Sequence, residues 1–168
     1  ADPRWAAQAA RIAARLKTAC GHRAVRIDHI GSTAVPGMDG RDIIDMQVTV
    51  ASLEVADELA DDLLKAGYPR VGSITADHSF DGSNTLLPKR FHASADPGRP
   101  RHVHLRVEGE PYQRFSLLFV DWLNANPAVR VEYRDVKLTE GVMRWFADAH
   151  LRAWEWADSV GWSPRTLS

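Results

Sequence analysis

The sequence predicts an α/β or α+β domain, in which a small mixed sheet is flanked by helices and the C-terminal half is helical. Two patterns support this. Apolar residues recur at three- and four-residue spacing near the N-terminus and in the second half of the chain, and short apolar or alternating runs lie between them. The length of 168 residues suits one folded unit, so we expect residues 1–168 to form a single domain.

The first expected element is an amphipathic helix over residues 3–20, because its apolar residues are spaced to form one buried stripe. The stripe consists of Trp5, Ala9, Ile12 and Leu16. Gly21 is placed to end this helix, since glycine readily adopts the left-handed conformation found after helix C-termini.

Two strands are expected next. Residues 24–30 alternate in side-chain character, which indicates a strand that ends abruptly at Gly31. Residues 43–50 are mostly apolar, with Asp45 and Gln47 as polar interruptions. This pattern is typical of a central strand that is covered on at least one face.

The middle of the chain is expected to contain one helix and three more strands. Residues 52–66 predict a helix with an acidic, solvated outer face. Residues 68–74 favour a strand, and the polar residues 75–88 favour a loop. Residues 89–94 and 101–107 are expected to pair as a hairpin with a longer connecting loop.

The C-terminal half predicts helices over residues 111–125, 128–139 and 142–160. Four of the six tryptophans lie from Trp145 onward. We interpret them as core and interface anchors, because large aromatic side chains dominate buried packing. A docking surface is the alternative for three of them. These three are Trp154, Trp156 and Trp162.

Composition excludes several classes of protein. The 21 Lys and Arg residues against 22 Asp and Glu residues give a net charge of −1, which argues against electrostatically driven nucleic-acid binding. The single cysteine, Cys20, excludes a disulfide scaffold and a cysteine-rich zinc site. No apolar run approaches the ~20 residues of a membrane span, and the N-terminal residues indicate a helix start, not a signal peptide. We therefore expect a cytoplasmic protein.

The strongest candidate site lies between the first two strands. Gly31 permits close approach of the backbone to a ligand, and the amides of Ser32 and Thr33 would point at an anion such as phosphate if they open a short helix. Asp45 and Gln47 are two residues apart on a strand and project from the same face. Since Mg²⁺ prefers carboxylate and phosphate oxygens, we expect Asp45 to hold Mg²⁺ and to form the catalytic pair with Gln47.

A second candidate is the basic stretch over residues 89–106, which holds five Lys or Arg residues and one acid, Asp96. The stretch also contains His92, His102 and His104. We interpret it as a wall for phosphate groups, with Lys89, Arg90 and the later histidine pair facing Asp45. An exposed hairpin with ordinary surface charge is the alternative.

A metal site is a further hypothesis. His102 and His104 alternate on one strand face and could ligate a metal with Asp45 or His29. Two histidines on a strand are more often hydrogen-bonded structural groups, and His29 lies on the face of its strand that we expect to be buried. We favour structural roles for these histidines, with a His/Asp metal hydrolase as the alternative.

Two strings of residues carry a family resemblance. They are His-Ile-Gly-Ser-Thr-Ala-Val-Pro-Gly-Met at residues 29–38 and Ile-Ile-Asp-Met-Gln-Val at residues 43–48. The sequence resembles the GrpB-like family, which belongs to the nucleotidyltransferase superfamily, over nearly the whole chain. In detail it is most similar to the C-terminal GrpB-like domain of actinobacterial dephospho-CoA kinases. Further matches lie at residues 90–100, 102–105, 119–123, 127, 133–137 and 154–157.

The resemblance implies a nucleotidyltransferase-like fold with a cleft for a nucleotide or other phosphate ligand, Mg²⁺ as cofactor, and nucleotidyl transfer as the activity. It also implies that Lys137 faces the cleft, where its charge would neutralise a triphosphate. Gln47 departs from the family pattern, because active nucleotidyltransferases have a second acid at this position. With one carboxylate fewer, two-metal chemistry has no evident partner for Asp45.

A non-catalytic role is the alternative that this departure favours. The chain would then be an accessory domain that assists the folding or assembly of a dephospho-CoA kinase in coenzyme A biosynthesis. The sequence contains no Gly-x-x-x-x-Gly-Lys-Ser/Thr phosphate loop, so it does not include the kinase half of such a protein.

Overall fold

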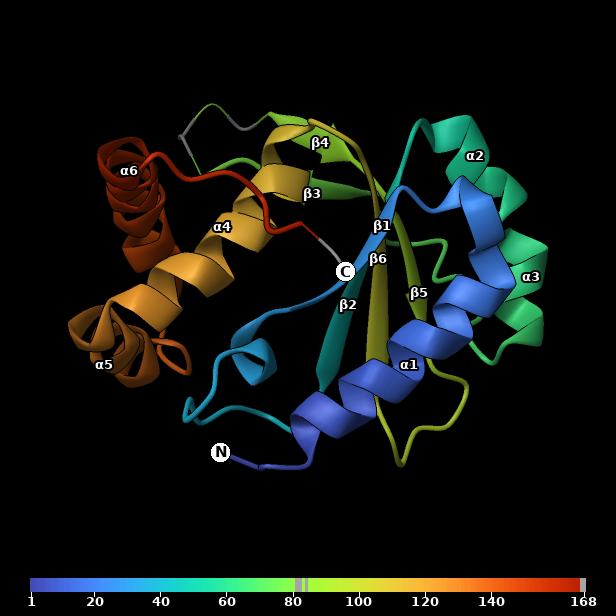
Figure 1. Cartoon of the computed structure of the whole chain (residues 1–168), viewed down its shortest axis with the longest axis horizontal. Helices are drawn as coiled ribbons and strands as arrows, with labels where there is room; N and C mark the ends of the chain where they lie inside the picture. The colour runs from blue at the N-terminus through green and yellow to red at the C-terminus, as the bar shows by residue number, and fades with distance from the viewer. Residues whose placement is uncertain (81–82, 84, 167–168) are drawn as a thin grey trace.

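A mixed four-stranded sheet lies between two groups of helices (Figure 1). The computed structural model describes residues 1–80, 83 and 85–166. The strands are ordered β1-β2-β6-β5 across the sheet, with β2 and β6 parallel and the two outer pairs antiparallel. Their bounds are Arg26–Ile30 for β1, Ile44–Val50 for β2, Arg90–Ala93 for β5 and Arg101–Val107 for β6. The predicted fold class is confirmed.

Three helices and their apolar side chains cover one face of the sheet. They are α1 (Trp5–Cys20), α2 (Leu53–Glu58) and α3 (Ala60–Lys65). The buried stripe predicted for α1 packs here against the apolar residues of β2 and β6. Ser52 caps α2 by accepting a hydrogen bond from the backbone N–H of Val55 at 3.2 Å, and the helix predicted over 52–66 is divided at Leu59.

The C-terminal helices cover the opposite face. They are α4 (Pro111–Ala125), α5 (Pro127–Val136) and α6 (Val142–Val160). Helix α4 contacts β1 and β6, and packs on its other side against α5 and α6 (Figure 1). A second apolar core forms between these helices, and the late tryptophans pack against it. Their interpretation as core anchors is therefore confirmed.

The segment between α3 and β5 differs from the prediction. Residues 68–74 are irregular apart from one bridge between Arg70 and His92, because a turn at Gly72 and Ser73 interrupts them. The predicted loop 75–88 instead contains β3 (Ala76–His78) and β4 (Leu86–Pro88), which pair as a small antiparallel sheet. Residues 81, 82 and 84 of that predicted loop lie outside the described part of the chain.

Two short 3-10 helices complete the described elements. One, Gly21–Arg23, follows α1, and Gly21 has the positive φ of 57° expected for the residue that ends a helix. The other, Ser32–Ala34, follows β1. Among the described helices, none is long and apolar enough to cross a membrane.

Candidate functional site

One face of the sheet carries polar side chains from neighbouring strands. The register pairs Asp45 with His102, Gln47 with His104 and Thr49 with Arg106 across the parallel strands β2 and β6. Because paired residues share a face, all six project toward α4. Phe91 of β5 pairs with His104, which places Lys89 next to the same face. We call this surface the polar face.

Asp45 lies at the centre of the candidate site. Both His102 Nδ1, at 3.3 Å, and His104 Nε2, at 3.2 Å, approach the same carboxylate oxygen, Oδ1. The other oxygen, Oδ2, is turned toward Gly31, where an added Cβ would lie only 3.2 Å from it. Gly31 also has a φ of 76°, which favours glycine. The close backbone approach expected at Gly31 is thus made to Asp45.

The charge states of this group follow from burial and hydrogen bonding. Burial alone would raise the pKa of Asp45, but hydrogen bonds from His102 and His104 outweigh it and hold the pKa well below its usual range. Burial lowers the pKa of His104 to about 4, against the opposing effect of Asp45. At neutral pH the site therefore contains an ionised carboxylate beside a neutral His104.

The neighbours of His104 indicate which ring nitrogen carries the proton. Lys89 Nζ lies 3.1 Å from His104 Nδ1 and 2.6 Å from Asp77 Oδ1. An ammonium group only donates, so Nδ1 is the acceptor and Nε2 carries the hydrogen that is donated to Asp45. Burial lowers the pKa of Lys89, and its pairing with Asp77 opposes that shift. Lys89 thus fixes the orientation of the imidazole ring.

A buried ion network extends from Lys89 across the polar face. Arg106 donates to Asp77 through Nε at 2.9 Å and through Nη2 at 3.1 Å. The side chains of Lys89, Asp77 and Arg106 are 8%, 10% and 5% exposed. Sequence reasoning missed Asp77, since a lone acid in a polar segment carries no pattern, and it did not single out Arg106. Asp77 is the carboxylate that both buried cations share, and it offsets part of their positive charge.

Gln47 joins the sheet to α4. Its side chain is fully buried, Oε1 accepts a hydrogen bond from Arg106 Nη1 at 2.9 Å, and Nε2 donates to the backbone carbonyl of Gln113 at 3.1 Å. An oxygen that faces a guanidinium group is poorly placed to ligate a cation as well. The geometry therefore gives Gln47 a structural role instead of the metal-directed role expected from the sequence.

A second group of polar atoms converges beside Gly31. Lys137, directly after α5, reaches the segment before β2, where its Nζ donates to the backbone carbonyl of Asp39. A Cβ added at Gly40 would lie 2.8 Å from Ser32 Oγ and 3.4 Å from Lys137 Nζ. Ser32 and Lys137 therefore face the same small space, which stays open because residue 40 is glycine. We call this arrangement the Ser32–Lys137 site.

Two other predicted site residues, Thr33 and His29, contact each other and not Lys137. Thr33 is buried, and its Oγ1 lies 2.8 Å from His29 Nε2. This contact agrees with the structural interpretation of His29, whose pKa burial lowers to about 4. The Thr33 side chain is therefore engaged within the protein, which leaves Ser32 as the hydroxyl beside Lys137.

The predicted basic wall is wrong for Arg90, and His92, a secondary candidate in the same stretch, also lies away from Asp45. These residues pair with Leu105 and Val103, so they project to the apolar face of the sheet. Arg90 forms an ion pair with Asp57 of α2 at 2.7 Å. His92 is fully buried, and its Nδ1 lies 2.9 Å from the backbone carbonyl of Tyr68. Alternation along β5 separates both from Lys89.

The arrangement of Asp45, His102 and His104 limits how a metal ion could bind at this site. Asp45, His102 and His104 do meet, but both rings hydrogen-bond to one carboxylate oxygen. Within the described residues, no group of three or more His, Cys, Asp or Glu side chains is arranged to hold a metal ion. Asp45 Oδ2 could supply one ligand to a Mg²⁺ ion whose other ligands come from phosphates and water. Two-metal chemistry would need a second carboxylate, and Gln47 stands in its place.

Comparisons with known proteins agree with this fold. The model of the GrpB protein family matches residues 1–143. A solved structure described as conserved protein GrpB from Enterococcus faecalis superposes with a TM-score of 0.72 and 24% identity, over 91% of this chain and 96% of that chain. This structural likeness shows a shared fold.

Two relatives are closer in sequence. The dephospho-CoA kinase of Mycobacterium leprae is 54% identical over 96% of this chain and 47% of its own length. That of Mycobacterium tuberculosis H37Rv is 53% identical over 98% of this chain and 47% of its own length. The chain thus spans about half the length of these curated relatives. The family model covers most of the chain, and the chain belongs to the GrpB protein family.

Proposed function

We propose that the Ser32–Lys137 site, together with Asp45, binds the phosphate groups of a nucleotide or related phosphorylated ligand. The observation that carries this proposal is the convergence of Ser32 Oγ and Lys137 Nζ on the space beside Gly40. A hydroxyl and an ammonium group can both donate to a phosphate oxygen, and the charge of Lys137 makes its hydrogen bond the stronger one. The ligand's phosphates would replace the Asp39 carbonyl as the partner of Lys137.

The proposed site binds its ligand without transferring a nucleotidyl group. In-line displacement at phosphorus relies on metal ions that clamp the attacking and leaving oxygens. In this chain the second acid is replaced by Gln47, whose oxygen already accepts from Arg106. Mg²⁺ would arrive with the ligand's phosphates, bind through Asp45 Oδ2, and reduce the repulsion between phosphate and carboxylate.

Gly40→Ala tests the proposed site directly. The added methyl group would meet Ser32 Oγ at 2.8 Å and occupy the space in which the phosphate is expected. Calorimetric titration with Mg-ATP, Mg-CTP and phosphorylated coenzyme A precursors should show binding by the wild type and a loss of about tenfold or more by the variant. Gly72→Ala is the matched control, because its Cβ meets nothing within 4 Å. Equal affinity of wild type and Gly40→Ala for every ligand would refute the proposed site.

The similarity to dephospho-CoA kinases supports a second candidate function. Relatives carrying that name contain a region at least 53% identical to this chain within a protein about twice its matched length. As an accessory domain, the chain would assist the folding or assembly of a kinase domain in coenzyme A biosynthesis. Co-expression with the remaining half of such a kinase should then raise its soluble yield or activity. Unchanged yield and activity would count against this role.

A further inference from the structure

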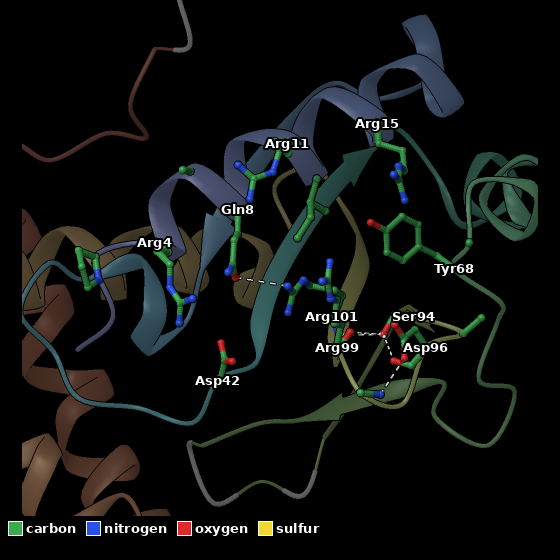
Figure 2. A pocket seen from close by; sticks show the side chains of 16 residues that line it. Arg4, Gln8, Arg11, Arg15, Asp42, Tyr68, Ser94, Asp96, Arg99 and Arg101 are labelled. Atoms are coloured by element: carbon green, nitrogen blue, oxygen red, sulfur yellow. Dashed lines mark hydrogen bonds between the residues drawn. The ribbon is translucent and has the colours of Figure 1, made fainter.

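A groove separate from the polar face runs between α1 and the loop that connects β5 to β6 (Figure 2). Its volume is about 1050 Å³, which is at the upper end of the range for pockets that hold small molecules. The groove lies at the apolar side of the sheet, since Arg101 precedes His102 on β6 and projects the opposite way. It therefore shares no residue with the Ser32–Lys137 site.

One wall of the groove is a polar stripe along α1. Gln8, Arg11 and Arg15 recur at three- and four-residue spacing, so they lie on one flank of the helix (Figure 2). This stripe adjoins the buried apolar stripe that anchors α1 to the sheet. The packing of the helix therefore fixes where its arginines emerge.

The facing wall is formed by Arg99, Arg101 and the loop that carries them (Figure 2). Ser94 holds this loop: its hydroxyl donates to the carbonyl of Arg99 at 2.8 Å and accepts from the N–H of Arg101 at 3.0 Å. Asp96 accepts from the N–H of Gly98 at 2.8 Å. The loop is thus organised before any ligand binds. Gln8 Oε1 links the two walls by accepting from Arg101 Nη2 at 3.3 Å.

The positive charge of the groove exceeds its negative charge, since it is lined by five arginines, Arg4, Arg11, Arg15, Arg99 and Arg101, and by two acids, Asp42 and Asp96. Within the described part of the chain, no carboxylate lies within 4.0 Å of the guanidinium groups of Arg11, Arg15, Arg99 or Arg101, as the ion pairs of the structure show. The acid Asp42 at the groove accepts a hydrogen bond from Trp5 Nε1 at 2.8 Å. Four guanidinium groups gathered around one hollow repel each other, and a bound anion relieves that repulsion.

We infer that this arginine groove, defined by Arg11, Arg15, Arg99 and Arg101, binds a small molecule through a di- or triphosphate group. Guanidinium groups bind phosphate oxygens in a bidentate manner. Because arginines line both walls of the groove, a phosphate group between them can be bound from two sides. The volume admits a ligand of nucleotide size, so a free polyphosphate and a nucleotide share the recognised chemistry. The inference is independent of the proposed function, because the two surfaces use different residues on opposite faces of the sheet.

The test is calorimetric titration at low ionic strength, in the presence of a chelator, with tripolyphosphate, ADP and adenosine as probes. Wild type should bind tripolyphosphate and ADP but not adenosine. The double variant Arg11→Gln and Arg15→Gln should bind both anions about tenfold or more weakly, because two charge-assisted contacts are lost. Glutamine has a helix propensity close to that of arginine, so folding should be preserved.

Two controls distinguish binding in the groove from an effect of net charge and from binding at the Ser32–Lys137 site. Arg114→Gln with Arg144→Gln removes two exposed charges from α4 and α6, which cover the other face of the sheet, and should leave affinity within about twofold because distant exposed charges are screened. Lys137→Gln, which removes the cation of the Ser32–Lys137 site, should leave affinity in the chelator within about twofold. The inference is overturned if wild type binds neither anion, or if the control pair loses as much affinity as the groove pair. Equal competition by polyglutamate would also overturn it, since the groove would then recognise acidic polypeptides.

Discussion

On the face of the sheet toward α1, residues such as Met46 and Leu105 are buried among other apolar side chains, whereas on the face toward α4, Gln47 and Arg106 are buried to almost the same extent. Burial of apolar surface is favourable in itself. Burial of polar groups is tolerated only when hydrogen bonds and ion pairs replace the lost water. The apolar face thus stabilises the fold, while the polar face orients side chains around Asp45.

The largest effect is expected from a substitution that breaks the polar face. Arg106→Leu would leave the Gln47 oxygen buried beside an apolar group and Asp77 with Lys89 as its remaining charged partner. Removing one partner of a buried ion pair typically lowers the free energy of unfolding by about 3–5 kcal/mol. Urea denaturation monitored by tryptophan fluorescence measures this, with Arg106→Lys as a variant that keeps the charge. A loss below about 1 kcal/mol would show that the network is not structurally required.

A cavity on the apolar face should have a somewhat smaller effect. Leu16 of α1 is fully buried in the core beneath the sheet. Leu16→Ala removes buried methyl groups and should lower the free energy of unfolding by about 2–5 kcal/mol. Leu16→Met keeps the volume and should cost less than about 1.5 kcal/mol. Equal losses in the free energy of unfolding for Leu16→Ala and Leu16→Met would show that side-chain volume does not determine stability at this position.

Mild acid should lower the free energy of unfolding of the unsubstituted protein, because it protonates side chains of the polar face. Burial gives His104 a pKa of about 4 in the folded protein, below the usual value of about 6.5 for a histidine in an unfolded chain. Between these two values the unfolded chain binds a proton that the folded chain does not, so stability rises with pH across this window and falls as pH decreases. His29 acts in the same direction, with a pKa of about 4.

Urea denaturation at intervals between pH 7 and pH 4 measures this dependence. His104→Asn should make the dependence shallower, because one of the three histidines whose pKa is lowered by burial no longer titrates. The same pH dependence in wild type and His104→Asn would contradict the neutral, buried state assigned to this ring.

The smallest effect is expected at Arg90, which pairs with the partly exposed Asp57. Ion pairs of this kind contribute about 0–1 kcal/mol. Arg90→Gln should therefore change the free energy of unfolding by less than about 1 kcal/mol. A larger loss in the same denaturation assay would place Arg90 in a more important structural role.

The apolar face could be predicted from the sequence more fully than the polar face. Helical spacing in α1 and the apolar run of β2 depend on local periodicity, which a single sequence displays. The strands β3 and β4 have three residues each and include polar residues and proline, so they carry no such pattern. Their pairing depends on contacts that the sequence does not show.

The residues of the candidate site divide in the same way, into those that a sequence pattern predicts and those that depend on tertiary contacts. Gly31, Ser32 and Asp45 were predicted from a glycine turn followed by an acid on a strand, whereas Lys137 came from the family resemblance alone. A single charged stretch over residues 89–106 wrongly predicts that Arg90 belongs to the site. Alternation along a strand puts Lys89 and Arg90 on opposite faces, and this was available in the sequence once the strand bounds were known. Asp77 required the tertiary structure.

The most direct test of the account compares Lys137→Gln with Arg90→Gln in calorimetric titrations with Mg-ATP and Mg-CTP. Each substitution removes one positive charge, but only Lys137 lies against Ser32 and Gly40, whereas Arg90 lies on the opposite face of the sheet. We predict that Lys137→Gln weakens binding about tenfold or more, while Arg90→Gln changes it less than about twofold. Wild-type affinity in Lys137→Gln, or equal losses in both variants, would contradict the assignment of phosphate binding to the Ser32–Lys137 site.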